Sequence, residues 1–353
     1  MCIFAGDPTI AIIGRKIMSS AHRIDVHQHV VPPFWAKALP AHGGDPSGPR
    51  SGDPSHSVLP PWSPDSAIDF MDSQEIATSI LSLTAPGVIG WENSGRREMA
   101  RRINEYTAGL VANWPDRFGH FATLPLPDID GALHELEYAF DTLRAEGVIL
   151  LANYAGRYLG EAAFEPIWAE LDRRHAVAYV HPGQPPLATA AGLAGPLVDY
   201  PFDTTRTAVQ LVLNGIVDRY PGARIILSHA GGFVPYASHR FAELAHVFRP
   251  DAKNPADILK SFQRFYFDTA LSSGPAALPS LKAFAQQGRI LFGTDYPFAP
   301  ADVAASFTGK LDAYDGLTAD EHSAISHRNA GILFPRLAPT DAAPECRSAR
   351  SRP

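Results

Sequence analysis

The feature that most constrains the fold is a regular alternation of short apolar runs with segments of helical periodicity. Eight runs rich in Val, Ile, Phe and Tyr recur along the chain, at residues 23–30, 78–84, 118–126, 147–153, 176–183, 224–232, 264–270 and 289–298. Runs of this length and composition predict buried strands. Segments such as 131–147 and 164–175 place apolar residues at helical spacing between them. Eight strands that alternate with helices predict an α/β protein with a (β/α)₈ TIM barrel.

A doubly wound open sheet is the main alternative, but no G-x-G-x-x-G follows the first run and no P-loop is present. No Gly/Ser linker or internal repeat divides the chain, which predicts one barrel domain over residues 21–337. The N-terminal extension 1–20 and the C-terminal tail 338–353 are predicted to be flexible. A Pro/Gly-rich insertion at 40–64 directly follows the first run, and this position favours a loop that covers the site.

Charge and cysteine content limit the partners and the setting. The net charge of −7 gives no positive field that would attract nucleic acid or an anionic membrane. No apolar stretch approaches the roughly 20 residues that span a bilayer, and no clear secretory signal opens the chain. The two cysteines, Cys2 and Cys346, lie in the polar ends, which excludes a disulfide framework and a Cys-based zinc site. A reducing, cytoplasmic setting is therefore predicted, and His, Asp or Glu must hold any metal.

Polar residues stand at the ends of several runs, where a parallel barrel gathers its active-site side chains. His27 and His29 end the first run two residues apart, so their side chains face the same side of the strand. His181 ends the fifth run, His229 the sixth and Asp295 the eighth. Imidazoles suit zinc and other transition metals, and a carboxylate compensates charge. We predict His27, His29, His181 and Asp295 as ligands of one metal, with His229 free as an acid or base.

Each of these residues also has a structural explanation when it is taken alone. Asp295 could cap the following helix, and the histidines could stand in turns. Together these explanations require separate coincidences at four strand ends, so the metal site is favoured. The fourth run, which ends "GVILLANYAG", offers no Lys or Glu to bridge two ions, and one metal is therefore predicted.

The segments "DVHQHVVPP", "VHPG", "LSHAGGFVPY" and "ILFGTDYPF" resemble the motifs of the amidohydrolase superfamily. More narrowly, residues 23–335 resemble the aminocarboxymuconate-semialdehyde decarboxylase family. This resemblance implies a distorted TIM barrel, one divalent metal and a non-oxidative decarboxylation without an organic cofactor. Carried over by position, His27, His29, His181 and Asp295 become the ligands, and His229 becomes the catalytic histidine. The His-x-His pair resembles the zinc-type members, so Zn²⁺ is expected, with Mn²⁺ or Mg²⁺ as alternatives.

Within the family, the chain is most similar to the 6-methylsalicylate decarboxylases of polyketide pathways. This similarity implies a small aromatic carboxylate as substrate, of the ortho-hydroxybenzoate type, with 6-methylsalicylate giving 3-methylphenol and CO₂. His229 or Asp295 would deliver the proton to the ring. Family dimers place an arginine in the neighbouring active site, and Arg240 stands at that position; a solvated helix arginine is the alternative. Phe34 and Phe298 are candidate walls of the substrate pocket.

Two other functions remain open at this point. A metal-dependent hydrolase, lactonase or hydratase on the same barrel would have an identical ligand set, so the motifs cannot separate it from a decarboxylase. A catalytically inactive binding protein is the second alternative, and the complete ligand set argues against it.

Overall fold

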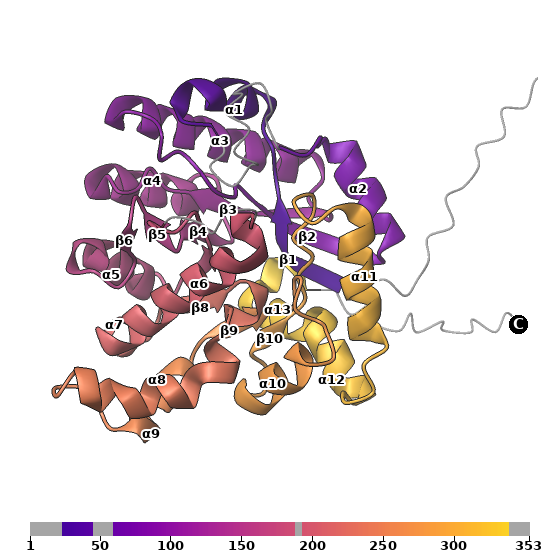
Figure 1. Ribbon diagram of the computed structural model, residues 1–353. Helices are drawn as coiled ribbons and strands as arrows, with labels where there is room; N and C mark the ends of the chain where they lie inside the picture. The colour runs from indigo at the N-terminus through magenta and orange to yellow at the C-terminus, as the bar shows by residue number, and fades with distance from the viewer. Residues whose placement is uncertain (1–22, 45–58, 188–192, 339–353) are drawn as a thin grey trace, which may run out of the picture.

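The computed structural model describes residues 23–44, 59–187 and 193–338. Its eight parallel strands form a nearly closed barrel in chain order, which confirms the predicted fold (Figure 1). The strands are β1 Arg23–His29, β2 Ile76–Ser82, β3 Phe118–Thr123, β4 Gly147–Leu151, β7 Val177–His181, β8 Arg224–Leu227, β9 Tyr266–Asp268 and β10 Ile290–Leu291. The predicted extension 1–20, the centre of the insertion (45–58) and the tail from 339 lie outside the described residues.

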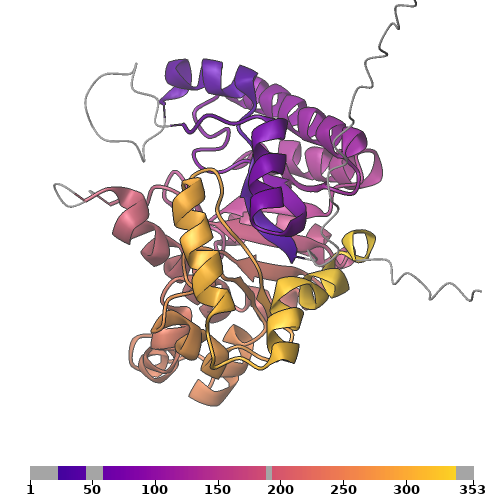
Figure 2. The ribbon, with the colours of Figure 1, turned by 90° about the vertical axis from the view of Figure 1, so that its right-hand side faces the viewer.

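An outer layer of helices surrounds the strands, as the second view shows (Figure 2). The longer helices are α2 Pro64–Ser73, α3 Asn93–Asn113, α4 Ile129–Asp141, α5 Glu165–Arg173, α6 Gly195–Leu213, α8 Val234–Phe248, α9 Pro255–Phe262, α10 Ala277–Phe284 and α11 Ala301–Asp312. The shorter ones are α1 Pro33–Ala38, α7 Ile216–Arg219, α12 Ala319–Ser323 and α13 Asn329–Leu333. In the described part of the chain, no helix has both the length and the apolar character needed to cross a bilayer.

The barrel closes between β1 and the segment that follows β10. The Val26 N–H donates to the carbonyl of Phe292 at 3.0 Å, and the His29 N–H donates to the carbonyl of Tyr296 at 2.7 Å. The predicted strand 289–298 is therefore too long, because regular pairing with β9 ends at Leu291 and the chain then runs beside β1. The polar end of this run lies in an irregular segment held directly against the first strand.

The fourth run also differs from its prediction. Strand β4 ends at Leu151, and Asn153 belongs to a small antiparallel hairpin of β5 Asn153–Tyr154 with β6 Arg157–Tyr158. The Asn153 side chain explains the turn, because its Oδ1 accepts the N–H of Gly156 at 3.0 Å.

Apolar side chains fill both the inside of the barrel and its upper rim. The interior cluster is closed by the C-terminal helix, and it contains Ile24, Val26, Ile80, Phe121, Ile149, Val177, Tyr179, Ile226, Leu291, Ala330, Leu333, Phe334 and Leu337. Above the carboxyl ends of β1 and β2, the fully buried Trp35 of α1 donates its indole N–H to the carbonyl of Gly87 at 2.9 Å. This contact ties α1 to the loop after β2 and leaves the polar strand ends beneath an apolar rim.

Candidate functional site

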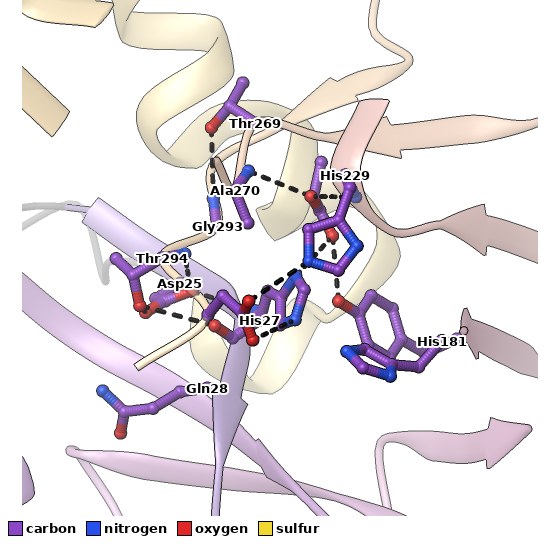
Figure 3. A network of polar contacts seen from close by, with 12 residues as sticks. Asp25, His27, Gln28, His181, His229, Thr269, Ala270, Gly293 and Thr294 are labelled. Carbon is purple, nitrogen blue, oxygen red and sulfur yellow. Dashed lines mark hydrogen bonds and ion pairs between the residues drawn. The ribbon is translucent and has the colours of Figure 1, made fainter. Parts of the chain in front are cut away.

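The five residues predicted for the metal centre come together at the carboxyl ends of the strands. Figure 3 shows His27, His181 and His229 from this group. The ligand atoms of His27, His181, His229 and Asp295 all lie within 4.8 Å of one another. His29 joins them, because its Nε2 lies 3.0 Å from Asp295 Oδ1 and 3.1 Å from His27 Nε2. The side chains of His27 and His29 are fully buried, so the cluster is shielded from solvent.

The hydrogen bonds of three histidines assign their tautomers. In each, Nδ1–H donates to an oxygen that can only accept: His27 to Asp268 Oδ2 (3.0 Å), His29 to the carbonyl of Ser82 (3.2 Å) and His181 to the carbonyl of Pro182 (2.9 Å). When these rings are neutral, each Nε2 therefore carries a lone pair. Metal-ligating histidines in proteins are held in the same way, with the second nitrogen fixed by a protein acceptor.

The Nε2 atoms of these histidines converge in a way that fits a metal ion. His27 Nε2 and His29 Nε2 face each other at 3.1 Å, and two lone pairs at that distance repel unless a cation or a proton lies between them. Among the described residues His181 Nε2 is buried without a hydrogen-bond partner, which is costly for a polar atom. Three imidazole nitrogens and one carboxylate are a suitable donor set for zinc or another divalent transition metal.

The electrostatics of the cluster also favour a cation. Burial lowers the pKa of His29, and it lowers the pKa of His181 well below the usual value, so both rings are neutral. Burial alone would lower the pKa of His27 too, but the carboxylates of Asp268 and Asp295 raise it to about 10. Burial opposes ionisation of Asp295, yet the charge of His27 and three histidine hydrogen bonds hold its pKa well below the usual value. Two buried carboxylates thus draw positive charge to this point.

His229 differs from the other three histidines in the way its ring is presented. Its Nε2 lies 3.2 Å from Asp295 Oδ2, and its Nδ1 is buried without a partner among the described residues. The backbone has a positive φ of 53° here, at the start of the "HAGG" turn. A Cβ at Gly232 would lie 2.2 Å from the carbonyl oxygen of Pro201, so only glycine fits there. The turn therefore holds His229 beside Asp295 in a strained but defined position.

Asp268 was missed by the strand-end reasoning. It ends β9 and is fully buried, and its carboxylate accepts from His27 Nδ1 (3.0 Å) and from the hydroxyl of Tyr179 (2.9 Å). It also accepts the backbone N–H groups of His229 (2.9 Å) and Ala270 (3.0 Å). Asp268 could have been found as a polar residue near the end of the run 264–270. It was not selected because a single Asp in "FYFDTA" matches no sequence motif.

Asp25 fixes the segment that carries Asp295. Its carboxylate accepts the N–H of His27 at 2.9 Å, and it accepts the hydroxyl of Thr294 at 2.6 Å and the N–H of the same residue at 3.1 Å. Burial raises its pKa to about 7 in spite of these bonds. A Cβ at Gly293 would lie 2.8 Å from the Cβ of His27, so this glycine permits the close approach of the two segments. Asp295, with a φ of 66°, then donates its N–H to the carbonyl of His27 at 2.7 Å.

The two predicted aromatic walls lie in different places. The ring of Phe298 packs edge-on against the ring of His29, with 5.4 Å between their centroids, so it stands beside the cluster. The ring of Phe34 packs against Tyr106 of α3, with 5.7 Å between the centroids. Only Phe298 is therefore seen in contact with the metal centre.

Arg240 lies outside the cluster within this single chain. It is exposed on α8 and lines a recess of about 720 Å³ between α6 and α8. The larger apolar side chains of the recess are Phe202, Val209, Leu213, Phe233, Tyr236 and Phe241. The predicted contact of this arginine with a substrate carboxylate would thus need a neighbouring subunit.

The parallel barrel, the His-x-His pair on β1, the histidines after later strands and the Asp beyond β10 together define a metal-dependent amidohydrolase-type enzyme. The profile of the amidohydrolase family matches residues 24–336, and the chain belongs to this family.

Relatives with assigned activities are decarboxylases of aromatic acids. The chain is 41% identical to the 6-methylsalicylic acid decarboxylase of Penicillium expansum, over 89% of this chain and 97% of that protein. It is 40% identical to a 6-methylsalicylic acid decarboxylase of Aspergillus aculeatus, over 89% and 96% of the two chains. A crystal structure of a dihydroxybenzoic acid decarboxylase from Polaromonas sp., with bound manganese and the inhibitor 2-nitroresorcinol, superposes with a TM-score of 0.75 at 27% identity. That match covers 89% of this chain and 96% of the other.

Proposed function

We propose that this protein is a metal-dependent, non-oxidative decarboxylase of an ortho-hydroxybenzoate, and that it converts 6-methylsalicylate to 3-methylphenol and CO₂. The observation that carries the proposal is the buried convergence of three Nε2 lone pairs and one carboxylate in a barrel of this family. The substrate is proposed from the 41% identity to a 6-methylsalicylic acid decarboxylase over nearly the whole of both chains.

The proposed ligands are His27, His29 and His181 through Nε2, and Asp295 through its carboxylate. Zn²⁺ is the proposed ion because imidazoles dominate the donor set, although a related structure holds manganese. When bound, the metal supplies a positive charge that orients the carboxylate and phenolic oxygens of the substrate and stabilises the negative charge on the phenolic oxygen. Asp268 holds the Nδ1–H of His27, so Nε2 is the nitrogen that turns to the metal once the ring gives up its second proton.

His229 is the proposed proton donor. Its Nε2 lies 3.2 Å from Asp295 Oδ2, and only 11% of its side chain is exposed, so a proton on this nitrogen is held inside the site. The proton adds to the ring carbon that bears the carboxylate. The carbon–carbon bond then breaks, its electron pair returns to the ring, and CO₂ leaves. The ring of Phe298, next to His29, supplies an apolar wall that helps to exclude water. Asp295 is the alternative donor.

We further propose that two copies associate through the face formed by α6 and α8. Tyr236 is 85% exposed and Phe248 is 77% exposed on α8, and Phe202 of α6 is 47% exposed. Monomeric proteins rarely expose apolar side chains in such a group. Arg240 lies in the recess of this face, where a second copy would cover it. Its guanidinium would then bind the substrate carboxylate of the partner as a two-pronged donor.

The test combines metal content with product analysis. Purified protein is assayed for bound metal by elemental analysis, and is incubated with 6-methylsalicylate and other hydroxybenzoates while CO₂ and the phenol are quantified. His181→Ala should lose most of the metal and the activity. The control His134→Ala, at an exposed site on α4, should lose neither. Turnover of a lactone without CO₂ from any aryl acid would favour the hydrolase, and the absence of both metal and turnover would favour the binding protein.

A further inference from the structure

Three arginines line a recess of about 230 Å³ at the end of the barrel opposite to the metal centre. Arg224 is the first residue of β8, Arg264 stands two residues before β9, and Arg289 directly precedes β10. Because the strands are parallel, these starting points gather on one face, and the polar cluster lies on the other. The recess therefore shares no residue with the proposed active site.

The arginines of this recess are only weakly neutralised. Within residues 23–44, 59–187 and 193–338, the side chain of Arg224 makes no hydrogen bond or ion pair. The guanidinium of Arg289 stacks on the ring of Tyr266 at 4.1 Å and donates to the carbonyl of Arg264 at 3.3 Å. Arg264 donates to the carbonyl of Pro221 at 3.1 Å. Carbonyl groups and an aromatic face hold these side chains in place, but they do not cancel their charge.

Two carboxylates close to residues of the recess are already engaged by other groups. Asp218 lies 3.9 Å from Arg264, and it binds Lys253 at 2.5 Å and the hydroxyl of Ser261 at 3.0 Å. Asp172 accepts the N–H of Gly222 at 2.6 Å. Neither carboxylate lines the recess. Three permanent positive charges thus share one concavity in a chain whose net charge is −7.

We propose that this recess binds a phosphate group, either as inorganic phosphate or as part of a small phosphate monoester. Guanidinium groups bind phosphate oxygens through paired N–H donors, and several of them around one concavity favour a multiply charged oxyanion. A volume of about 230 Å³ admits one phosphate group with a few attached atoms or waters, and it excludes a large ligand.

Binding here would stabilise the half of the barrel that holds the metal centre. The strands that begin at or just after these arginines are short, and β8 leads to His229 while β9 ends at Asp268. A ligand that binds the folded state alone raises the stability of that state as its concentration exceeds the dissociation constant. The expected consequence is a phosphate-dependent rise in the unfolding temperature at constant ionic strength.

The test is calorimetric titration of the metal-loaded protein with inorganic phosphate and, in a second arm, with glycerol 3-phosphate, both at ionic strength held constant with chloride. We expect saturable binding that weakens at least tenfold in Arg224→Met and in Arg289→Met. Arg157→Met, which removes the same charge from a half-exposed position paired with Glu161, should bind as the unchanged protein does. Tighter binding of glycerol 3-phosphate would identify a monoester as the ligand, and equal binding would identify free phosphate.

Arg289→Lys keeps the charge but loses the paired N–H donors, and it should weaken phosphate binding severalfold. This variant provides a second test in case the methionine variants misfold. The proposal is overturned if no saturable heat is observed, or if the arginine variants bind phosphate as tightly as the unchanged protein. The second result would place phosphate at the metal centre instead. Because the readout is heat of binding and not turnover, the outcome does not depend on the proposed decarboxylation.

Discussion

Substitution of Asp268 by Asn tests whether this buried carboxylate prepares His27 for metal binding. The change keeps the size of the side chain but replaces one acceptor oxygen by an NH₂ group. The carboxylate accepts from two groups on each side: the His27 ring and the Tyr179 hydroxyl at one oxygen, and the N–H groups of His229 and Ala270 at the other. Whichever way the amide turns, its NH₂ group faces two donors that lose their acceptor.

The magnitude follows from those contacts. Each buried donor left without a partner costs about 1–3 kcal/mol, so the free energy of unfolding should fall by about 2–6 kcal/mol. If the NH₂ group instead donates to His27 Nδ1, the ring proton moves to Nε2 and blocks the ligand atom. Loss of such a supporting carboxylate lowers metal affinity by about 10–100-fold.

The assay is a competitive metal titration against a chelator, with urea denaturation in parallel. Glu135→Gln is the matched control, because Glu135 of α4 is also buried and accepts from two α3 side chains, Asn104 at 2.7 Å and Arg101 at 2.9 Å. This variant should lose stability and keep the metal affinity of the unchanged protein. Unaltered metal affinity in D268N would refute the assigned role of Asp268.

Three further predictions concern packing, pH and assembly. Gly293→Ala should lower the free energy of unfolding by about 1–3 kcal/mol in urea denaturation, because the new Cβ would lie 2.8 Å from the Cβ of His27. The control Gly109→Ala, in an open position on α3, should raise the free energy of unfolding by about 0.5–1 kcal/mol. Equal effects of the two substitutions would contradict the close approach at Gly293. His120 is 1% exposed, and burial lowers its pKa to about 4, below that of the unfolded chain. As the pH falls from about 6.5 to 5, the unfolded state therefore gains a proton that the native state does not. Over this pH range the unchanged protein should lose about 2 kcal/mol more free energy of unfolding than His120→Leu. Equal losses of stability in the two proteins would contradict this reasoning. Tyr236→Glu should shift the sedimentation coefficient from dimer to monomer without loss of bound metal, and an unshifted coefficient would contradict an interface on this face.

The eight strands could be predicted because each is a short apolar run between helical segments, and parallel pairing follows from that alternation. The meeting of His27, His29, His181, His229 and Asp295 could be predicted because a parallel barrel brings its strand ends to one mouth. The family and the decarboxylase class expected from the motifs are confirmed by the family profile and by the relatives. The roles of the individual site residues stay predictions.

The local backbone paths by which some of these residues reach the site could not be predicted, because they depend on contacts between distant segments. Asp295 lies four residues beyond the end of β10, and it reaches the cluster because Asp25 holds Thr294 and Gly293 allows the backbone to approach His27. No periodic pattern in the sequence indicates that the backbone at Gly293 comes so close to His27. Arg240 shows a different limit of prediction from the sequence. Its position after the "HAGG" motif predicts that it binds the substrate carboxylate, but it lies on an exposed helix face and could do so only in the active site of a second chain.

The carboxylates behind the histidines explain why this site suits a divalent ion better than a proton. With His29 and His181 held neutral by burial, Asp268 and Asp295 leave two negative charges in a largely buried region. One proton on His27 balances only one of these charges, and it leaves the lone pair of His181 Nε2 unused. A divalent ion balances both charges and engages all the Nε2 lone pairs at once. The metal should therefore bind with release of the His27 proton, so its affinity should rise with pH up to the pKa of that ring.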